Sequence, residues 1–334
     1  MNKTSAPLTR RQSLQVLAGT AAAATGLAPA AAWSQVRFPD KPISLLVPFG
    51  PGGIADLTAR AVAEHMSKSL GQAVVVENKP SAGSIVASQA VATAKPDGHT
   101  LLLLSNGNAI SVSLFKKLPF DAQTDFAPIT TLGFFDIGLF VAASSKFTTL
   151  QQAVAFAKAN PGKLNVGTIA PGSTQHLSAK LFETIAGVDV LVVPYKGSPG
   201  VLTALRAGEI DIAFEIVGPM VPQVTAGVIK ALAVSSDKRN PALPDVPTVM
   251  QAGVASYNVA SWNALAAPAG TPPEVLDKLG RAARDAIASP EVQARLGKLG
   301  MRLQGSTGAE LQALLGSEIK RWGAVIRAAK IEPE

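Results

Sequence analysis

The stretch Ile43-Ser44-Leu45-Leu46-Val47-Pro48-Phe49-Gly50-Pro51-Gly52-Gly53 decides the fold. Its first five residues predict a short buried strand, and the glycines that follow predict a tight turn. Beyond the turn, the pattern predicts a helix over 55–70, a strand over 73–76, a helix over 84–94 and a strand over 101–104. This alternation indicates right-handed crossovers and a parallel sheet with helices on its faces.

The middle of the chain repeats the alternation. Strands are predicted over 164–166, 190–193, 210–214 and 231–234, and helices over 150–159, 174–185, 201–207 and 219–226. Helices over 273–289, 290–299 and 309–329 complete the chain, and the extended segments 130–143 and 257–267 are the expected connections between two units. The expected fold is therefore α/β with two lobes, each a mostly parallel sheet flanked by helices. Residues 35–138 and 257–334 are assigned to one lobe, and 139–256 to the other.

Composition excludes several classes of protein. The chain has 334 residues, of which 47% are apolar, and no cysteine. A packed core is therefore expected, and thiolate metal sites and cysteine nucleophiles are excluded. The three histidines, His65, His99 and His176, lack metal-ligand spacing, so no metal site is expected.

The net charge of +7 arises partly from the N-terminus. Residues 1–34 hold three of the 30 basic residues and no acidic one, which leaves 27 basic and 23 acidic residues, or +4, elsewhere. These basic residues are scattered and form no stripe, so no nucleic-acid partner is expected.

The first 34 residues predict an export signal. Arg10 and Arg11 precede an alanine-rich apolar stretch, and small residues follow at Ala30-Ala31-Ala32 and Ser34. This order is typical of a secretory signal peptide, here resembling the twin-arginine type, with cleavage expected near 32–35. An uncleaved membrane anchor is the alternative. The signal predicts a periplasmic protein.

The turn after the first strand is the first candidate site. Glycines let a ligand approach the backbone, and a helix start offers unpaired N–H groups that attract anions. The glycines are equally consistent with a tight turn alone. A further alternative is a dinucleotide-binding oxidoreductase, because Gly50-x-Gly52-x-x-Ala55, with Glu77 after it, has the outline of that fingerprint. Asp56 would then place negative charge beside the pyrophosphate, and the export signal also argues against this alternative.

Polar residues follow the other predicted strands. These loops are Ser105-Asn106-Gly107-Asn108, the segment 167–174, and Pro194-Tyr195-Lys196-Gly197-Ser198-Pro199, with Glu215 after a fourth strand. A buried Glu215 would need a partner, such as a ligand ammonium or hydroxyl. The sequence contains no G-x-S-x-G elbow and no nucleophile–base pair. It therefore predicts a site that holds a ligand without transforming it, and a protein that is not an enzyme and uses no cofactor.

Six motifs in order carry a family resemblance. They are Phe38-Pro39-Asp40-Lys41-Pro42-Ile43, Val47-Pro48-Phe49-x-Pro51-Gly52-Gly53-x-x-Asp56, Val75-Val76-Glu77-Asn78, Pro96-Asp97-Gly98, Val193-Pro194-Tyr195-Lys196-Gly197-Ser198 and Leu243-Pro244-Asp245-Val246-Pro247-Thr248. Together they resemble the Bug receptors, the extracytoplasmic solute receptors of tripartite tricarboxylate transporters. The resemblance covers essentially the whole chain after the signal.

The resemblance implies a two-lobed type II periplasmic binding protein whose cleft closes on a small carboxylate or related polar solute. It implies delivery of that solute to the membrane permease of the transporter; a role as a sensor contacting a signalling partner is the alternative. The ligand-binding residues it implies are Phe49, Gly52, Gly53, Ala55, Ser105, Asn106, Thr168, Gly172, Ser173, Thr174, His176, Lys196, Ser198 and Glu215, with Asp56 organising the first loop. Glu215 stands where relatives often have aspartate.

Overall fold

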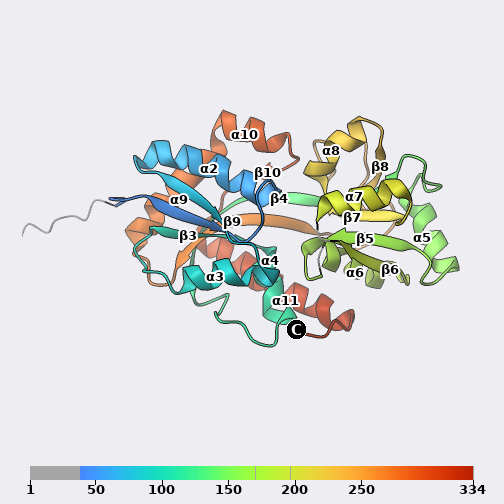
Figure 1. Ribbon diagram of the computed structural model, residues 1–334, viewed down its shortest axis with the longest axis horizontal. Coiled ribbons are helices and arrows are strands. Elements are labelled where there is room, and N and C mark those ends of the chain that lie inside the picture. Colours follow the sequence, from blue (N-terminus) through green and yellow to red (C-terminus); the bar gives the residue numbers. More distant parts are fainter. Residues whose placement is uncertain (1–37, 170, 196, 334) are drawn as a thin grey trace, which may run out of the picture. The chain divides into compact units, whose positions relative to one another are not determined.

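The computed structural model describes residues 38–169, 171–195 and 197–333 (Figure 1). The predicted signal peptide and Lys196 lie outside these residues. Contacts divide the chain into Met1–Asp40 and Lys41–Glu334, and the fold described below is that of the second unit. In the described part of the chain, no helix is both long and apolar enough to cross a membrane.

The first sheet is built around the strand Ile43–Val47. Strand β1 (Ile43–Val47) lies between β2 (Val74–Asn78) and β3 (Thr100–Ser105), and both pairings are parallel. Helix α2 (Ile54–Leu70) connects β1 to β2, while η1 (Ala82–Ser84) and α3 (Ile85–Ala92) connect β2 to β3. In Figure 1, α2 and α3 lie on opposite faces of this sheet. Both faces are covered, which explains why β1 and β3 are almost entirely apolar.

One long strand runs through both sheets of the unit. Strand β4 (Phe126–Ala142) pairs antiparallel with β9 (Ala260–Pro268) through Asp136. It then pairs antiparallel with β7 (Ile212–Ile216) from Ile137 onward and with β8 (Ile229–Val234) from Gly138 onward. Strand β9 also pairs antiparallel with β3, and the short β10 (Arg302–Leu303) pairs with β4. The sheets are therefore mixed rather than mostly parallel, because the crossing strands run against the βαβ strands.

The second sheet repeats the parallel motif. Strand β5 (Asn165–Ile169) lies between β6 (Leu191–Tyr195) and β7 (Ile212–Ile216), both parallel, and β8 (Ile229–Val234) pairs with β4. The accompanying helices are α5 (Leu150–Ala159), α6 (Thr174–Ala186), α7 (Ser198–Ala207) and α8 (Val217–Thr225). The predicted α/β alternation is confirmed here almost element by element.

Three C-terminal helices complete the fold, namely α9 (Pro273–Ala288), α10 (Pro290–Gly297) and α11 (Gly308–Ala328). Trp322 of α11 is fully buried, and its indole Nε1 donates to Glu318 at 2.8 Å. A single apolar cluster includes Trp322, Trp262 of β9 and Phe214 of β7. The same hydrophobic core therefore holds residues from both sheets.

Two expectations about local structure are wrong. The segment after β3, expected to be a polar loop, is the first turn of helix α4 (Asn106–Leu114). Ser105 caps it, with Asn108 completing a capping box, and this pair is the start signal that the loop reading overlooked. Glu215, expected after its strand, lies within β7, because the strand runs two residues further than its most apolar part.

Candidate ligand-binding site

The start of α2 lies directly after β1, in the turn at Gly52 and Gly53. Gly52 has a φ of 81°, which favours glycine, and Gly53 is the residue that precedes the helix. No side chain caps α2, so its first N–H groups are left for another acceptor. Phe49 stands in the same turn with 38% of its surface exposed. Ala55, by contrast, is buried.

Asp56, in the first turn of α2, is hydrogen-bonded to the residues around this turn. Its carboxylate accepts hydrogen bonds from the Gly52 N–H at 2.9 Å, from Arg60 at 3.0 Å and from Asn78 at 2.9 Å. Burial alone would raise the pKa of Asp56, but these hydrogen bonds outweigh it and lower the pKa below its ordinary value. Because the Gly52 N–H is already bound to a carboxylate, the geometry disfavours a pyrophosphate here.

The start of α4 adds a second group of polar atoms at the same sheet edge. The Asn106 side chain, 1% exposed, donates through Nδ2 to the backbone oxygen of Ala260 at 3.2 Å. Its Oδ1 has no hydrogen-bond partner among the described residues. A Cβ on Gly107 would lie 2.7 Å from the Ser84 hydroxyl and 3.7 Å from the Phe49 ring. The turns after β1 and β3 therefore converge.

The start of α6, after β5, belongs to the second sheet. Ser173 caps the helix by accepting from the His176 N–H at 3.1 Å, and the Gly172 N–H donates to His176 Nδ1 at 3.4 Å. His176 thus stabilises the loop before α6 through two hydrogen bonds, one at its backbone N–H and one at its ring. Burial, and then the charge of Lys180, lower the pKa of His176, which favours the neutral ring that accepts this bond. The Thr168 hydroxyl is buried and donates to the Ile169 carbonyl.

Glu215 is the most deeply placed charged group of the candidate set, with no exposed surface. Its Oε2 accepts from Ser198 at 2.9 Å, from Gln175 at 3.4 Å and from the Ile216 N–H at 3.2 Å. Its Oε1 is buried and has no partner among the residues described. Burial raises the pKa of Glu215 to about 7 despite these bonds.

Contacts join the two groups of residues. The Thr174 hydroxyl lies 3.5 Å from that of Ser261 on β9, the strand that also meets Asn106. A Cβ on Gly172 would clash with Leu114, the last residue of α4, so the α6 turn packs against the C-terminal end of that helix. The starts of α4 and α6 are linked through the neighbouring residues Ala260 and Ser261 of β9, and Gln175 connects Glu215 to the α6 start.

Three residues of this region were not among the sequence candidates. Gln175 binds Glu215, Ser261 meets Thr174, and the side-chain amide of Asn263, 1% exposed, has no partner in the described chain. Asn263 pairs with Ser105 across β3 and β9. Ser261 and Asn263 are polar residues inside the mostly apolar run Ala260–Pro268, which is a signal that sequence reasoning could have used.

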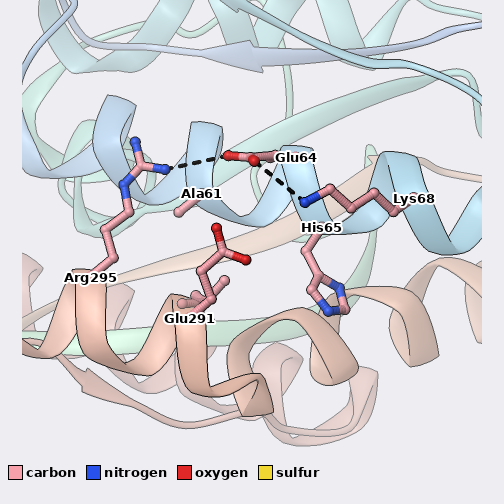
Figure 2. Close-up of a pocket in the computed structure, with 7 residues that line it drawn as sticks. Ala61, Glu64, His65, Lys68, Glu291 and Arg295 are labelled. Atoms are coloured by element: carbon pink, nitrogen blue, oxygen red, sulfur yellow. Dashed lines mark hydrogen bonds and ion pairs between the residues drawn. The ribbon is translucent and has the colours of Figure 1, made fainter.

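Two cavities of the described structure lie away from these residues. A groove of about 580 Å³ runs between α9 and the segment before α11, beside Arg284 and Ser306. A pocket of about 10 Å³, large enough for about one water molecule, lies between α2 and α10. Figure 2 shows Glu64 there between Arg295 and Lys68, each ion pair measuring 3.5 Å. This small pocket therefore lies within a contact between two helices that carries charged side chains.

The fold and the polar groups define an α/β solute-binding protein. A family model described as the tripartite tricarboxylate transporter family receptor matches residues 58–331. The chain belongs to this family, which includes the Bug receptors. It is 37% identical over 313 residues to a UPF0065 protein of Pseudomonas sp. strain P51, covering 93% of each chain. It is 32% identical over 300 residues to BugT of Bordetella pertussis, covering 89% of this chain and 92% of that protein.

Solved structures agree with this assignment. The periplasmic binding protein BugD superposes with a TM-score of 0.79 at 31% identity, over 89% of this chain and all of BugD. The R. palustris protein Rpa4515, solved with adipate, gives 0.81 at 33% identity, over 89% of this chain and all of that one. MatC of Rhodopseudomonas palustris, with bound malate, gives 0.77 at 33% identity, over 86% and 100%. The protein is a solute-binding receptor, and the resemblance seen in the sequence is confirmed.

Proposed function

We propose that this protein is a periplasmic receptor that captures a small carboxylate between its two sheets and delivers it to a tripartite tricarboxylate-type permease. Two similar structures hold adipate and malate, both dicarboxylates. The observation that carries the proposal is that the polar starts of α4 and α6, which follow strands of different sheets, both meet β9, at Ala260 and Ser261. The uncapped start of α2 supplies N–H groups suited to a carboxylate.

The proposed ligand contacts are those expected from the sequence, with Asp56 and His176 holding the loops. Residues 35–138 with 257–334 would form one lobe and 139–256 the other. Capture then works by closure about β4 and β9, the strands at which the first sheet gives way to the second. Closure is favoured by contacts that a bridging ligand makes only in the closed state. The predicted signal peptide would be removed on export.

Calorimetry on protein refolded free of ligand tests the proposal. Succinate, malate, adipate and citrate are titrated in turn, with glucose as an uncharged control. Binding of at least one carboxylate, and none of glucose, is expected. A well-folded protein that binds no carboxylate would overturn the proposal.

Delivery to a permease is tested separately from binding. Uptake of the bound carboxylate by cells that express the permease subunits is measured with and without the receptor. Uptake that does not depend on the receptor would favour the alternative role as a sensor that contacts a signalling partner.

A further inference from the structure

Among the site residues predicted from the sequence, two buried oxygen atoms accept no hydrogen bond from any described residue. They are Oδ1 of Asn106 and Oε1 of Glu215, on side chains 1% and 0% exposed. Asn263 differs from both, because its unpartnered amide has a donor as well as an acceptor. A buried acceptor without a partner costs about 1–3 kcal/mol, so native proteins rarely leave one unsatisfied. Two such atoms in one region therefore call for a shared explanation.

The other polar atom of each side chain already takes part in hydrogen bonds, and this determines which atom is free. Asn106 Nδ2 donates to the Ala260 carbonyl, which can only accept, so the amide cannot be flipped. Glu215 Oε2 accepts from Ser198, Gln175 and the Ile216 N–H. The remaining Asn106 Oδ1 is an acceptor only, and the ionised Glu215 Oε1 is another.

A series of contacts connects the two residues that carry the free oxygens. Asn106 meets β9 at Ala260, whose neighbour Ser261 lies against Thr174 at 3.5 Å. Thr174 is followed by Gln175, which donates to Glu215 at 3.4 Å. Asn106 follows the first sheet and Glu215 belongs to the second, so the free acceptors stand on opposite sides of the line where β4 crosses between the sheets.

An ionised carboxylate has no proton to donate, so a ligand consisting only of carboxylates and hydrocarbon leaves Asn106 Oδ1 unsatisfied. We infer that the ligand carries a hydrogen-bond donor group on the carbon chain beside its carboxylate, and that this group donates to Glu215, Asn106 or both. An ammonium group has three protons and can donate to both oxygens, whereas a hydroxyl has one proton and donates to one of them. This inference rests on the proposed function and narrows its ligand class to hydroxy- or amino-carboxylates.

The acidity of Glu215 is compatible with this role. Burial raises the pKa of Glu215 to about 7, so ionising it near neutral pH requires little free energy when a donor is present. In the opposite arrangement, a ligand carboxylate would lie against Glu215 Oε1. Glu215 would then have to stay protonated, and the partly negative Oδ1 of Asn106 would face a negatively charged carboxylate.

Matched acids that differ at one carbon test the inference by calorimetry at pH 8. Succinate, malate and aspartate form one set, and glutarate, 2-hydroxyglutarate and glutamate form a second with one more carbon. In at least one set, the hydroxy or amino member should bind about tenfold or more tightly than the plain dicarboxylate, since a hydrogen bond to a charged group is worth that much. The two substituted members distinguish hydroxyl from ammonium.

Glu215→Gln tests the assignment to this residue. Three donors surround the Oε2 position, so the amide oxygen must take that place and the NH₂ group must face the ligand. The variant should therefore lose the preference for the substituted acid by about tenfold or more. Glu183→Gln, on the same helix as Gln175 but bound to Lys180, should keep the preference and serves as the matched control.

The outcomes separate this inference from the proposed function. Equal affinity for plain and substituted acids in both sets would overturn the inference and leave the receptor function standing. A preference that survives Glu215→Gln would also overturn it, as would a liganded crystal structure in which only ordered water contacts the two oxygens. Failure of every carboxylate to bind would overturn the function and the inference together.

Discussion

Glu215→Gln should stabilise the ligand-free protein in alkaline but not in acidic solution. The pKa of Glu215 is raised from 4.5 to about 7, chiefly by burial. The unfolded chain therefore loses its proton at lower pH than the folded protein does. As pH rises from about 4.5 to 7, the unfolded state is increasingly favoured, and the free energy of unfolding falls.

The size of the effect follows from the two pKa values. At about 1.4 kcal/mol per pH unit, the gap between 4.5 and about 7 corresponds to roughly 3 kcal/mol in total. Part of this is already lost at pH 5, so about 2.5 kcal/mol is lost between pH 5 and pH 8. Glutamine stays neutral, accepts the same three hydrogen bonds and avoids this loss.

Urea unfolding of both proteins at pH 5 and pH 8 measures the effect. The stability difference between variant and wild type should be small at pH 5 and should grow by about 2.5 kcal/mol at pH 8. Other titrating groups, such as His176, are common to both proteins and cancel. A difference for Glu215→Gln that is the same at both pH values would refute the argument from burial.

Three further predictions concern Gly53, Asp56 and Gly218. Gly53→Val should abolish carboxylate binding with little loss of stability, because a Cβ there meets only the Gly50 oxygen at 3.9 Å but blocks the start of α2. Calorimetry and urea unfolding measure both effects, and Gly297→Val is the control because a Cβ at Gly297 meets no other atom within 4 Å. Unchanged affinity of Gly53→Val would contradict the prediction. Asp56→Ala should lower the free energy of unfolding by about 2–3 kcal/mol, since Gly52 and Asn78 lose a charged hydrogen-bond acceptor. Urea unfolding at pH 7 measures the loss, and a change below about 0.5 kcal/mol would show that the turn does not depend on Asp56. Gly218→Ala should destabilise the protein by about 1–3 kcal/mol, because the new Cβ would clash with the backbone oxygen of Leu299, just after α10. A melting temperature equal to that of the wild type would disprove this close approach.

Local patterns were enough to predict most of the secondary structure. The runs at Ile43–Val47 and Leu150–Ala159 have the periodicity and flanking breakers of their element, so strand and helix were predicted with the observed bounds. The α4 start was missed because Asn106-Gly107-Asn108 has poor helix propensity, and the cap at Ser105 outweighs it. Strand direction was predicted only for the βαβ parts, because a crossover specifies parallel neighbours and the long strands β4 and β9 carry no such local constraint.

By itself, the sequence determined the α/β class, the receptor family and the turns that follow the strands, because these depend on neighbours along the chain. Only the tertiary structure decided which atoms of those turns remain free. Asn106 and Glu215 are 109 positions apart, and each has one polar atom satisfied by a partner from another element. Hydrogen bonding depends on distances of about 3 Å in space, and periodicity along a chain does not encode such distances between elements that meet only on folding.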